Sequence, residues 1–252
     1  MKPTSNKSII FSENNLPIIS SAALKNTVTL WHEPTYKFLR YLAARLICDS
    51  LSGVFGVVSA PMKFLPLQAE TLAATQQVAV ELFPWEREHQ LALPAAVDPV
   101  AHTGFYADRG LDSVRCWTTH LMGGPVSGMA MLWGYRAQPD ELWLAWFGLL
   151  PAVRGRGAGT KLLDWLIALA RTEGRRTLRL WTTDEAEYTT AMGLYTRRGF
   201  RAEQYPQLPG EKWNTLVFSL GLDGRVPIPW VDMPNRAELC GREAPHLHAF
   251  AA

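Results

Sequence analysis

The stretch that decides the fold is residues 149–160, LLPAVRGRGAGT. It follows an apolar, tryptophan-rich segment at residues 142–149 and leads into KLLDWLIALA, residues 161–170, whose apolar spacing is helical. A strand that ends in a glycine turn at the start of a helix leaves several backbone N–H groups without intrahelical partners. Because the helix dipole also makes this point electropositive, phosphate groups bind there. The stretch therefore predicts a phosphate-binding loop.

The residue types of the loop suit an anion. Gly155, Gly157 and Gly159 let the backbone approach a phosphate without an intervening side chain. Arg154 and Arg156 add positive charge beside it. Taken alone, the same residues are also compatible with an ordinary turn before a helix.

Two common nucleotide-binding motifs do not fit the spacing. A P-loop requires Gly-Lys followed by Ser or Thr, whereas Thr160 separates Gly159 from Lys161. A dinucleotide-binding loop requires Gly-x-Gly-x-x-Gly, and Thr160 stands in place of its last glycine. The order present is Arg-x-x-Gly-x-Gly, preceded by Leu-x-Pro.

A second motif, AMGLYTRRGF, occupies residues 191–200. Ala191, Leu194 and Tyr195 share one face of a helix. The arginine pair that follows suits the negative end of the helix dipole, and Gly199 supplies a left-handed residue after the last turn. The motif therefore predicts the end of a second helix.

Together the two motifs resemble those of the GNAT superfamily of N-acetyltransferases. The first resembles the loop that holds the pyrophosphate of acetyl-CoA in that family, and the second resembles its Ala-x-x-Leu-Tyr-x-x-x-Gly-Phe signature. They stand in the family's order, with a β-like run at residues 176–181 between them. The resemblance covers residues 62–221 and implies an α/β GNAT fold, in which helices flank a mixed central sheet.

The apolar patterns predict the elements of such a fold. Expected strands are 62–67, 114–121, 126–135, 142–149, 176–181, 201–205 and 213–220, and expected helices are 69–83, 161–173 and the one that carries Tyr195. A turn is expected at residues 138–140, and capping boxes at the start of the last helix from Thr182 with Glu185 or Asp184 with Glu187. Strand alternation places Trp143 and Trp146 on opposite faces unless a bulge intervenes.

The flanking segments differ in composition from this domain. Residues 1–61 form an N-terminal extension of uncertain structure. Either Met62 is the true start of the protein, or the extension packs on the domain or on a partner. Residues 222–252 contain four prolines and are expected to be an irregular C-terminal tail.

The composition of the chain bears on its cellular compartment and on its binding partners. The formal net charge is +2, which gives no reason to expect a nucleic acid or an acidic membrane as partner. The three cysteines are far apart and odd in number, so a disulfide framework is not expected and a cytoplasmic setting is the simplest interpretation. No convincing signal peptide is present, and no metal site is expected.

The resemblance implies acetyl-CoA as co-substrate and assigns residues to it. The backbone of the strand before the loop should bind the pantetheine arm, and the loop should bind the pyrophosphate. The expected cofactor-binding residues are Phe147, Gly148, Leu149, Arg154, Gly155, Arg156, Gly157, Ala158, Gly159 and Thr160. Tyr195 stands where the family places a phenol near the sulfur of CoA, as general acid; the alternative is a core aromatic whose hydroxyl is satisfied locally.

The general base is not marked by a motif. Many family members carry a glutamate on the strand before the loop, but residues 142–148 contain no carboxylate. The candidates are Glu81 and Glu86, with Glu88 and Glu141 as further carboxylates, and a water relay remains open.

These expectations amount to transfer of an acetyl group to a primary amine, directly, in a ternary complex. A small-molecule amine is favoured over a protein as acceptor, a homodimer is compatible with the family, and a longer acyl chain remains open. The rival hypothesis is a non-catalytic acyl-CoA-binding or sensor domain, because the strand carboxylate is missing.

Overall fold

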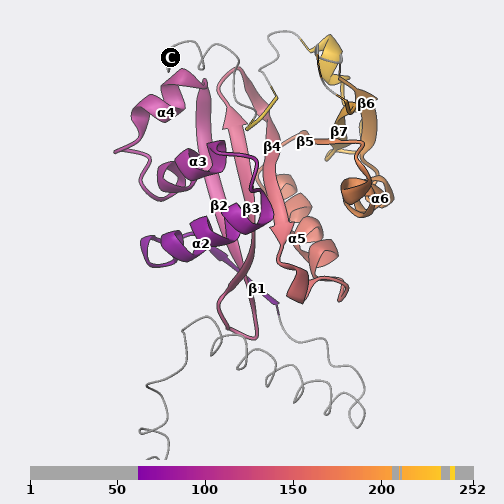
Figure 1. The fold of residues 1–252 in the computed structure, drawn as a ribbon. Coiled ribbons are helices and arrows are strands. Elements are labelled where there is room, and N and C mark those ends of the chain that lie inside the picture. Colours follow the sequence, from indigo (N-terminus) through magenta and orange to yellow (C-terminus); the bar gives the residue numbers. More distant parts are fainter. Residues whose placement is uncertain (1–61, 206–209, 211, 234–238, 242–252) are drawn as a thin grey trace, which may run out of the picture. The chain divides into compact units, whose positions relative to one another are not determined.

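In the part of the chain that the computed structural model describes, residues 62–205, 210, 212–233 and 239–241, seven strands form one mixed sheet (Figure 1). All of these residues lie in one of the two units into which the chain divides, Ser59–Ala252. The extension predicted at residues 1–61, and most of the last part of the predicted tail, lie outside the described residues.

The strand order is β1-β2-β3-β4-β5-β7-β6, and every neighbouring pair is antiparallel except β4 and β5, which run parallel. The strands are β1 (Met62–Pro66), β2 (Leu111–Leu121), β3 (Val126–Tyr135), β4 (Gln138–Leu149), β5 (Thr177–Thr183), β6 (Arg201–Gln204) and β7 (Thr215–Gly221). The predicted α/β fold with a mixed sheet flanked by helices is confirmed.

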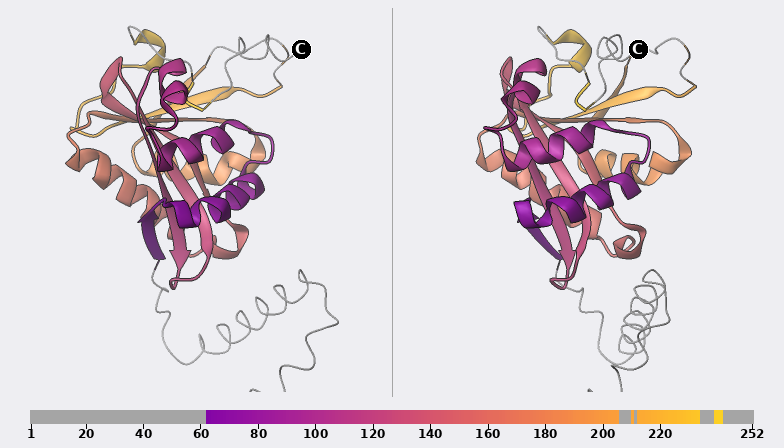
Figure 2. Two further views of the ribbon diagram at one scale, coloured as in Figure 1. Left: turned by 90° about the vertical axis from the view of Figure 1, so that its left-hand side faces the viewer. Right: turned by 60° about the vertical axis from the view of Figure 1, so that its left-hand side comes forward.

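Helices cover both faces of this sheet. The helices are α2 (Ala69–Leu82), α3 (Glu88–Val97), α4 (Thr103–Asp108), α5 (Ala158–Thr172) and α6 (Thr189–Arg197). Figure 2 shows α2 and α3 crossing one face, with α5 behind the sheet. Within the described residues, no helix combines the length and the apolar character that crossing a bilayer requires.

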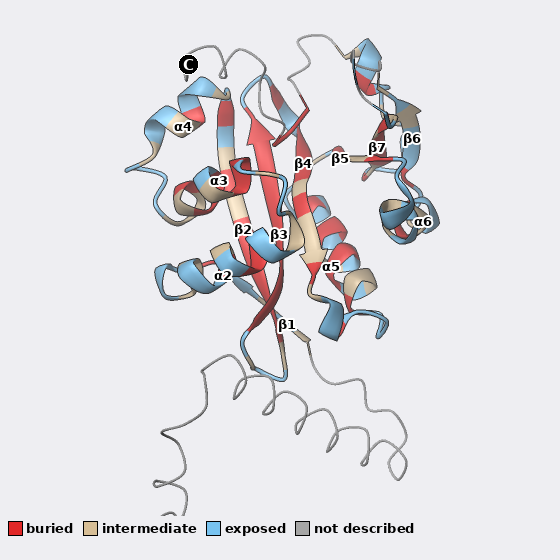
Figure 3. Ribbon diagram, viewed as in Figure 1, coloured by how far each residue is buried: buried red, intermediate tan, exposed pale blue. Residues whose placement is uncertain are grey.

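Two apolar cores result, one on each face of the sheet. One packs α5 and α6 against the sheet through residues such as Leu162, Leu166 and Leu194. The other packs α2, α3 and α4 through residues such as Ala79 and Leu93. The central strand β3 is buried along its whole length because both of its faces are covered (Figure 3).

A β-bulge interrupts the pairing of β4 with β3. Met131 pairs with Trp146 and Leu132 pairs with Leu144, so Ala145 has no partner in the register. The extra residue reverses the facing of the strand beyond it. Trp143 and Trp146 therefore lie in the same core, beneath α2–α4, as the bulge alternative anticipated.

Pairing between β4 and β5 is short. It comprises Glu141 with Thr177, Leu142 with Leu178 and Trp143 with Arg179, and it ends there. Beyond these pairs the two strands separate, so that residues 144–149 of β4 have no pairing partner on β5. This separation makes room for the site described below.

The prediction of a turn at residues 138–140 is wrong, because these residues begin strand β4. Tyr135 pairs with Gln138, so a two-residue turn at Arg136 and Ala137 joins β3 to β4. Pro139 lies within β4 but before the first pair with β5, which involves Glu141, so its missing N–H costs no hydrogen bond in that ladder.

The expected capping boxes at the start of α6 are also wrong. Thr182 belongs to β5, and the turn η3 (Ala186–Tyr188) separates that strand from α6. Asp184 accepts hydrogen bonds from the backbone N–H and the side-chain amide of Asn214, at 2.8 and 2.7 Å. Its carboxylate thus ties β5 to β7, a role that local spacing does not reveal.

The described part of the predicted tail packs against the sheet. Trp230, in the turn η4 (Trp230–Asp232), is 2% exposed, and its backbone N–H donates to Glu203 at 2.6 Å. The indole N–H of Trp181 donates to the carbonyl of Cys240 at 2.6 Å. These contacts make residues 222–233 and 239–241 part of the domain, although little of their backbone is regular.

A buried ion pair holds β4 and β5 together where they still pair. Arg179 is fully buried and donates two hydrogen bonds to the carboxylate of Glu141, each of 2.8 Å. It also donates to the hydroxyl of Ser219 on β7 at 2.6 Å and to the carbonyl of Ile228 at 2.8 Å.

We expect Glu141→Ala to lower the free energy of unfolding by about 3–5 kcal/mol, because it removes the carboxylate that accepts two hydrogen bonds from the buried guanidinium and leaves only Glu203, 3.9 Å away. Asp140→Ala is the matched control: its pair with Arg176, at 3.7 Å, is more than half exposed on both sides, and its loss should cost at most about 1 kcal/mol. Urea unfolding of both variants measures the difference, and equal losses would contradict the structural role given to Glu141.

Candidate active site

Two adjoining cavities open where β4 and β5 separate. The first, of about 480 Å³, lies between the end of β4, the glycine loop and α6, and we call it the loop cavity. The second, of about 510 Å³, lies between β4, β5, the segment after α2 and η3, and we call it the strand cavity. Phe147, Tyr188 and Ala191 line both, so the two cavities share a wall.

The glycine loop has the backbone that the sequence predicted. Gly155 and Gly157 adopt φ values of 76° and 73°, in the left-handed region where a side chain is strained. Gly157 precedes the first residue of α5, so the first N–H groups of that helix lie at the loop cavity.

Two arginines bring positive charge to the loop cavity. The Nε of Arg154 donates to the carbonyl of Leu149 at 2.7 Å, which fixes the guanidinium beside the end of β4. Arg197 reaches the cavity from the end of α6. Sequence reasoning assigned Arg197 only to the helix dipole; its place in the second motif, three residues after Leu194 and so on the same helix face, was the available signal.

Nine of the ten residues expected to bind the cofactor line the loop cavity. They are Phe147, Gly148, Leu149, Arg154, Gly155, Gly157, Ala158, Gly159 and Thr160. Arg156 is exposed and is absent from the lining. A Cβ at position 148 would lie 2.9 Å from the Leu82 side chain and 3.0 Å from the Phe83 ring, so a larger residue there would require these side chains to shift.

The lining of the loop cavity suits a long ligand with an anionic end. Its lining includes the start of helix α5, Arg154 and Arg197, apolar side chains such as Leu82, Phe147 and Leu194, and one carboxylate, Glu187. These residues fit the diphosphate and the less polar arm of coenzyme A.

Tyr195 is a buried phenol at the strand cavity. Its ring packs against Phe147, Phe200 and Phe218, with centroid distances of 6.3, 5.8 and 5.5 Å. Its hydroxyl has no hydrogen-bond partner among the described residues. Burial raises the pKa of this phenol well above its ordinary value of 10.0, so the group stays protonated at neutral pH.

Glu86 is the sequence-predicted carboxylate that lies in the strand cavity. It is half-buried and accepts a hydrogen bond from the indole N–H of Trp146. Burial raises the pKa of its carboxyl group above the ordinary value, while hydrogen bonds from Trp146 and Trp85 act in the opposite direction.

The other candidate carboxylates lie elsewhere. Glu81 is exposed on α2 and lines neither cavity. Glu88 is ion-paired with Arg109, and Glu141 with Arg179. Of the four carboxylates that the sequence offered as a base, Glu86 is therefore the one that lines the strand cavity.

Sequence reasoning missed three residues of the strand cavity. Glu185 and Glu187 were expected to cap α6, but both line this cavity, as does Tyr188. Burial raises the pKa of the Tyr188 phenol, with a further contribution from its hydrogen bond to Glu187. The available signal was the acidic run of residues 184–187 between the two motifs.

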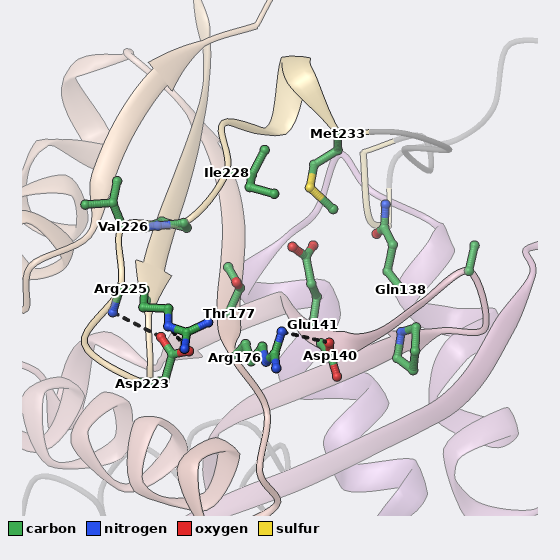
Figure 4. A pocket seen from close by; sticks show the side chains of 14 residues that line it. Gln138, Asp140, Glu141, Arg176, Thr177, Asp223, Arg225, Val226, Ile228 and Met233 are labelled. Carbon is green, nitrogen blue, oxygen red and sulfur yellow. Dashed lines mark hydrogen bonds and ion pairs between the residues drawn. The ribbon is translucent and has the colours of Figure 1, made fainter.

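A third cavity, of about 450 Å³, lies where β4 and β5 begin (Figure 4). Its charged side chains are all ion-paired: Arg176 lies 3.7 Å from Asp140, Arg225 lies 3.7 Å from Asp223, and Glu141 pairs with the buried Arg179. It contains none of the motif residues. Among the described residues, no group of three or more His, Cys, Asp or Glu side chains is arranged to hold a metal ion.

Comparisons with known proteins agree with this geometry. Residues 79–200 match the model of the acetyltransferase (GNAT) family. A solved GNAT-family protein from Desulfovibrio desulfuricans is similar in fold, with a TM-score of 0.52 and 18% identity over 64% of this chain and 99% of its own. The ribosomal-protein-S18-alanine N-acetyltransferase of Escherichia coli has a TM-score of 0.47 and 18% identity, over 64% of this chain and 94% of its own. None of the curated proteins matches the chain.

The matched segment begins within α2 and ends at Phe200, the last residue of the second motif. It thus includes both sequence motifs, the bulge in β4 and most of the lining of the two cavities. Residues 79–200 of this chain therefore match an acetyltransferase domain of the GNAT family.

Proposed function

We propose that the protein transfers an acetyl group from acetyl-CoA to a primary amine, directly, in a ternary complex. Acyl transfer from acyl-CoA to an amine is the general reaction of the GNAT family. The observation that carries the finer proposal is the pair of adjoining cavities: one suits a diphosphate, the other contains a phenol and a carboxylate, and Phe147 lies between them.

The loop cavity would hold the co-substrate. The N–H groups at the start of α5, together with Arg154 and Arg197, bind the phosphates. The segment of β4 that is unpaired with β5 offers backbone groups to the amide-containing arm, as an added strand would. Acetyl-CoA supplies the activated thioester.

Tyr195 would act as the general acid. It lines the strand cavity and packs against Phe147, which lines both cavities, and its unpartnered hydroxyl would give a proton to the sulfur that leaves. Burial raises the pKa of the phenol, but the same burial destabilises a thiolate, so the tendency to transfer the proton is retained.

Glu86 would act as the general base. A lysine-like amine of pKa about 10.4 is protonated at neutral pH and cannot attack. A carboxylate of raised pKa accepts the amine proton more readily than an exposed one. Glu86 therefore takes the place of the carboxylate that β4 lacks, which weakens the argument for a non-catalytic sensor.

Binding of CoA depends on Arg154 in this proposal. Arg154→Ala should weaken the affinity for acetyl-CoA about tenfold or more, because a charge-assisted hydrogen bond to a phosphate contributes about 1.5–3 kcal/mol. Arg136→Ala removes an exposed arginine from the β3–β4 turn and serves as the control. Calorimetry measures both, and an equal effect of the two substitutions would argue against the loop cavity as the cofactor site.

Removal of the Tyr195 hydroxyl should affect catalysis alone. Tyr195→Phe should lower kcat about 10²-fold. It should leave the stability nearly unchanged, since no hydrogen bond is lost. A thiol-release assay with urea unfolding of the same variant measures both quantities; an unaltered kcat would remove Tyr195 from the mechanism.

The rate should depend on pH through Glu86. Its carboxylate must be ionised to accept a proton, so kcat should fall as the pH falls through a pKa above the ordinary 4.5. Trp85→Phe removes a hydrogen bond that lowers this pKa, so the acidic limb should move to higher pH. Glu86→Gln should abolish the limb together with most of the activity, whereas an identical profile in all three proteins would exclude Glu86 as the base.

A further inference from the structure

The strand cavity carries charge of one sign. Three carboxylates line it, those of Glu86, Glu185 and Glu187, and none of its described lining residues is Lys, Arg or His. The neighbouring loop cavity is lined by Arg154 and Arg197, and Glu187 lines both cavities. Within the described part of the chain, none of the three carboxylates forms an ion pair with a basic side chain.

The three carboxylates lie at different depths. Glu86 is half-buried between Trp85 and Trp146. Glu185 and Glu187 are exposed and lie at the mouth of the cavity on η3 and the residue before it. The half-buried carboxylate of Glu86 and the exposed pair therefore offer two separate sites for positively charged groups in one cavity.

The outer carboxylates are held in place by neighbours. The hydroxyl of Thr183 donates to Glu185 at 2.7 Å, and the Tyr188 side chain is hydrogen-bonded to Glu187. The negative charges of Glu86, Glu185 and Glu187 all raise the pKa of the Tyr188 phenol, after the larger effect of its burial. The three charges thus act on one small region.

Aromatic rings form much of the remaining wall. The tryptophans that line the cavity are Trp85, Trp146, Trp181 and Trp213. Aromatic faces attract alkylammonium groups and pack well against a methylene chain. A ligand with cations at both ends of a short aliphatic spacer would match both the charges and the walls.

We propose that the acceptor is a small diamine or polyamine that binds in the strand cavity with two ammonium groups. One amine lies by Glu86 and Tyr195, where it loses its proton and is acetylated. A second remains an ammonium ion between Glu185 and Glu187. The acetylation step rests on the function proposed above, whereas binding of a dication does not. A cavity of about 510 Å³ suits such a molecule and favours it over a basic peptide.

Three amines with the same six-carbon chain test the proposal: 1,6-diaminohexane, hexylamine and 6-aminohexanoate. They differ only in the charge at the far end, which is positive, absent or negative. We expect kcat/KM to be about tenfold or more higher for the diamine than for hexylamine, and lowest for the amino acid. The ratio should fall as the salt concentration rises from about 0.05 to about 0.5 M, because the outer carboxylates are exposed.

The double variant Glu185→Gln/Glu187→Gln keeps the shape and removes the charge. We expect it to reduce the diamine-to-hexylamine ratio to near one. Glu70→Gln, which removes an exposed carboxylate from the first turn of α2, is the matched control and should preserve the ratio. A ratio near one in the unaltered protein, or a lysine-rich peptide as a better substrate than any diamine, would overturn the proposal.

A binding measurement distinguishes this proposal from the proposed function. Because four tryptophans line the cavity, diamine binding in the presence of CoA should change the tryptophan fluorescence. If diamines bind more tightly than hexylamine but no thiol is released, the result supports the diamine site and contradicts the proposed acetyltransferase activity. If amines are acetylated without preference for the diamine, catalysis stands and the dication site fails.

Discussion

The bulge at Ala145 is the constraint on which the candidate site depends. Because side chains alternate along a strand, one unpaired residue reverses the facing of everything beyond it. Trp146 thereby joins Trp143 in the core beneath α2–α4, where its N–H reaches Glu86, and Phe147 turns toward α6 to form the wall between the cavities. Strict alternation would exchange the rings of Trp146 and Phe147. An indole would then lie against the phenol of Tyr195, and Glu86 would lose its hydrogen-bond donor.

The separation of β4 from β5 requires that the two strands be fixed elsewhere. Only three residue pairs join them, so backbone hydrogen bonds alone give a short ladder. Arg179 adds side-chain bonds at that point to Glu141, to Ser219 and to the carbonyl of Ile228. A buried charge is expensive to desolvate, but here its hydrogen bonds join three strands and the C-terminal segment. The side-chain bonds of Arg179 thus hold β4 and β5 together at their paired end, while the strands stay apart at the other end.

How far the sequence predicts this protein depends on whether a feature is local. The glycine loop and the end of α6 were predicted because positive φ and the helix dipole are properties of a few neighbouring residues. Asp184 was misassigned because its partner, Asn214, is distant in sequence. The helix α3 was not predicted, since Pro94 lies inside it. Glu86 could be named but not preferred over Glu81, because its distinction is a bond to Trp146, which exists only in the fold.

The two cavities differ in the charge of their linings. Arg154 and Arg197 line only the loop cavity, Glu86 and Glu185 line only the strand cavity, and Glu187 lines both. A cavity lined mainly by charge of one sign attracts a ligand of the opposite sign, and such an arrangement favours two oppositely charged molecules bound end to end. Tyr195 lines the strand cavity and packs against Phe147 of the shared wall, and burial keeps its phenol neutral. A neutral donor there disturbs neither field, and a charged acid would weaken the binding of one of the two ligands.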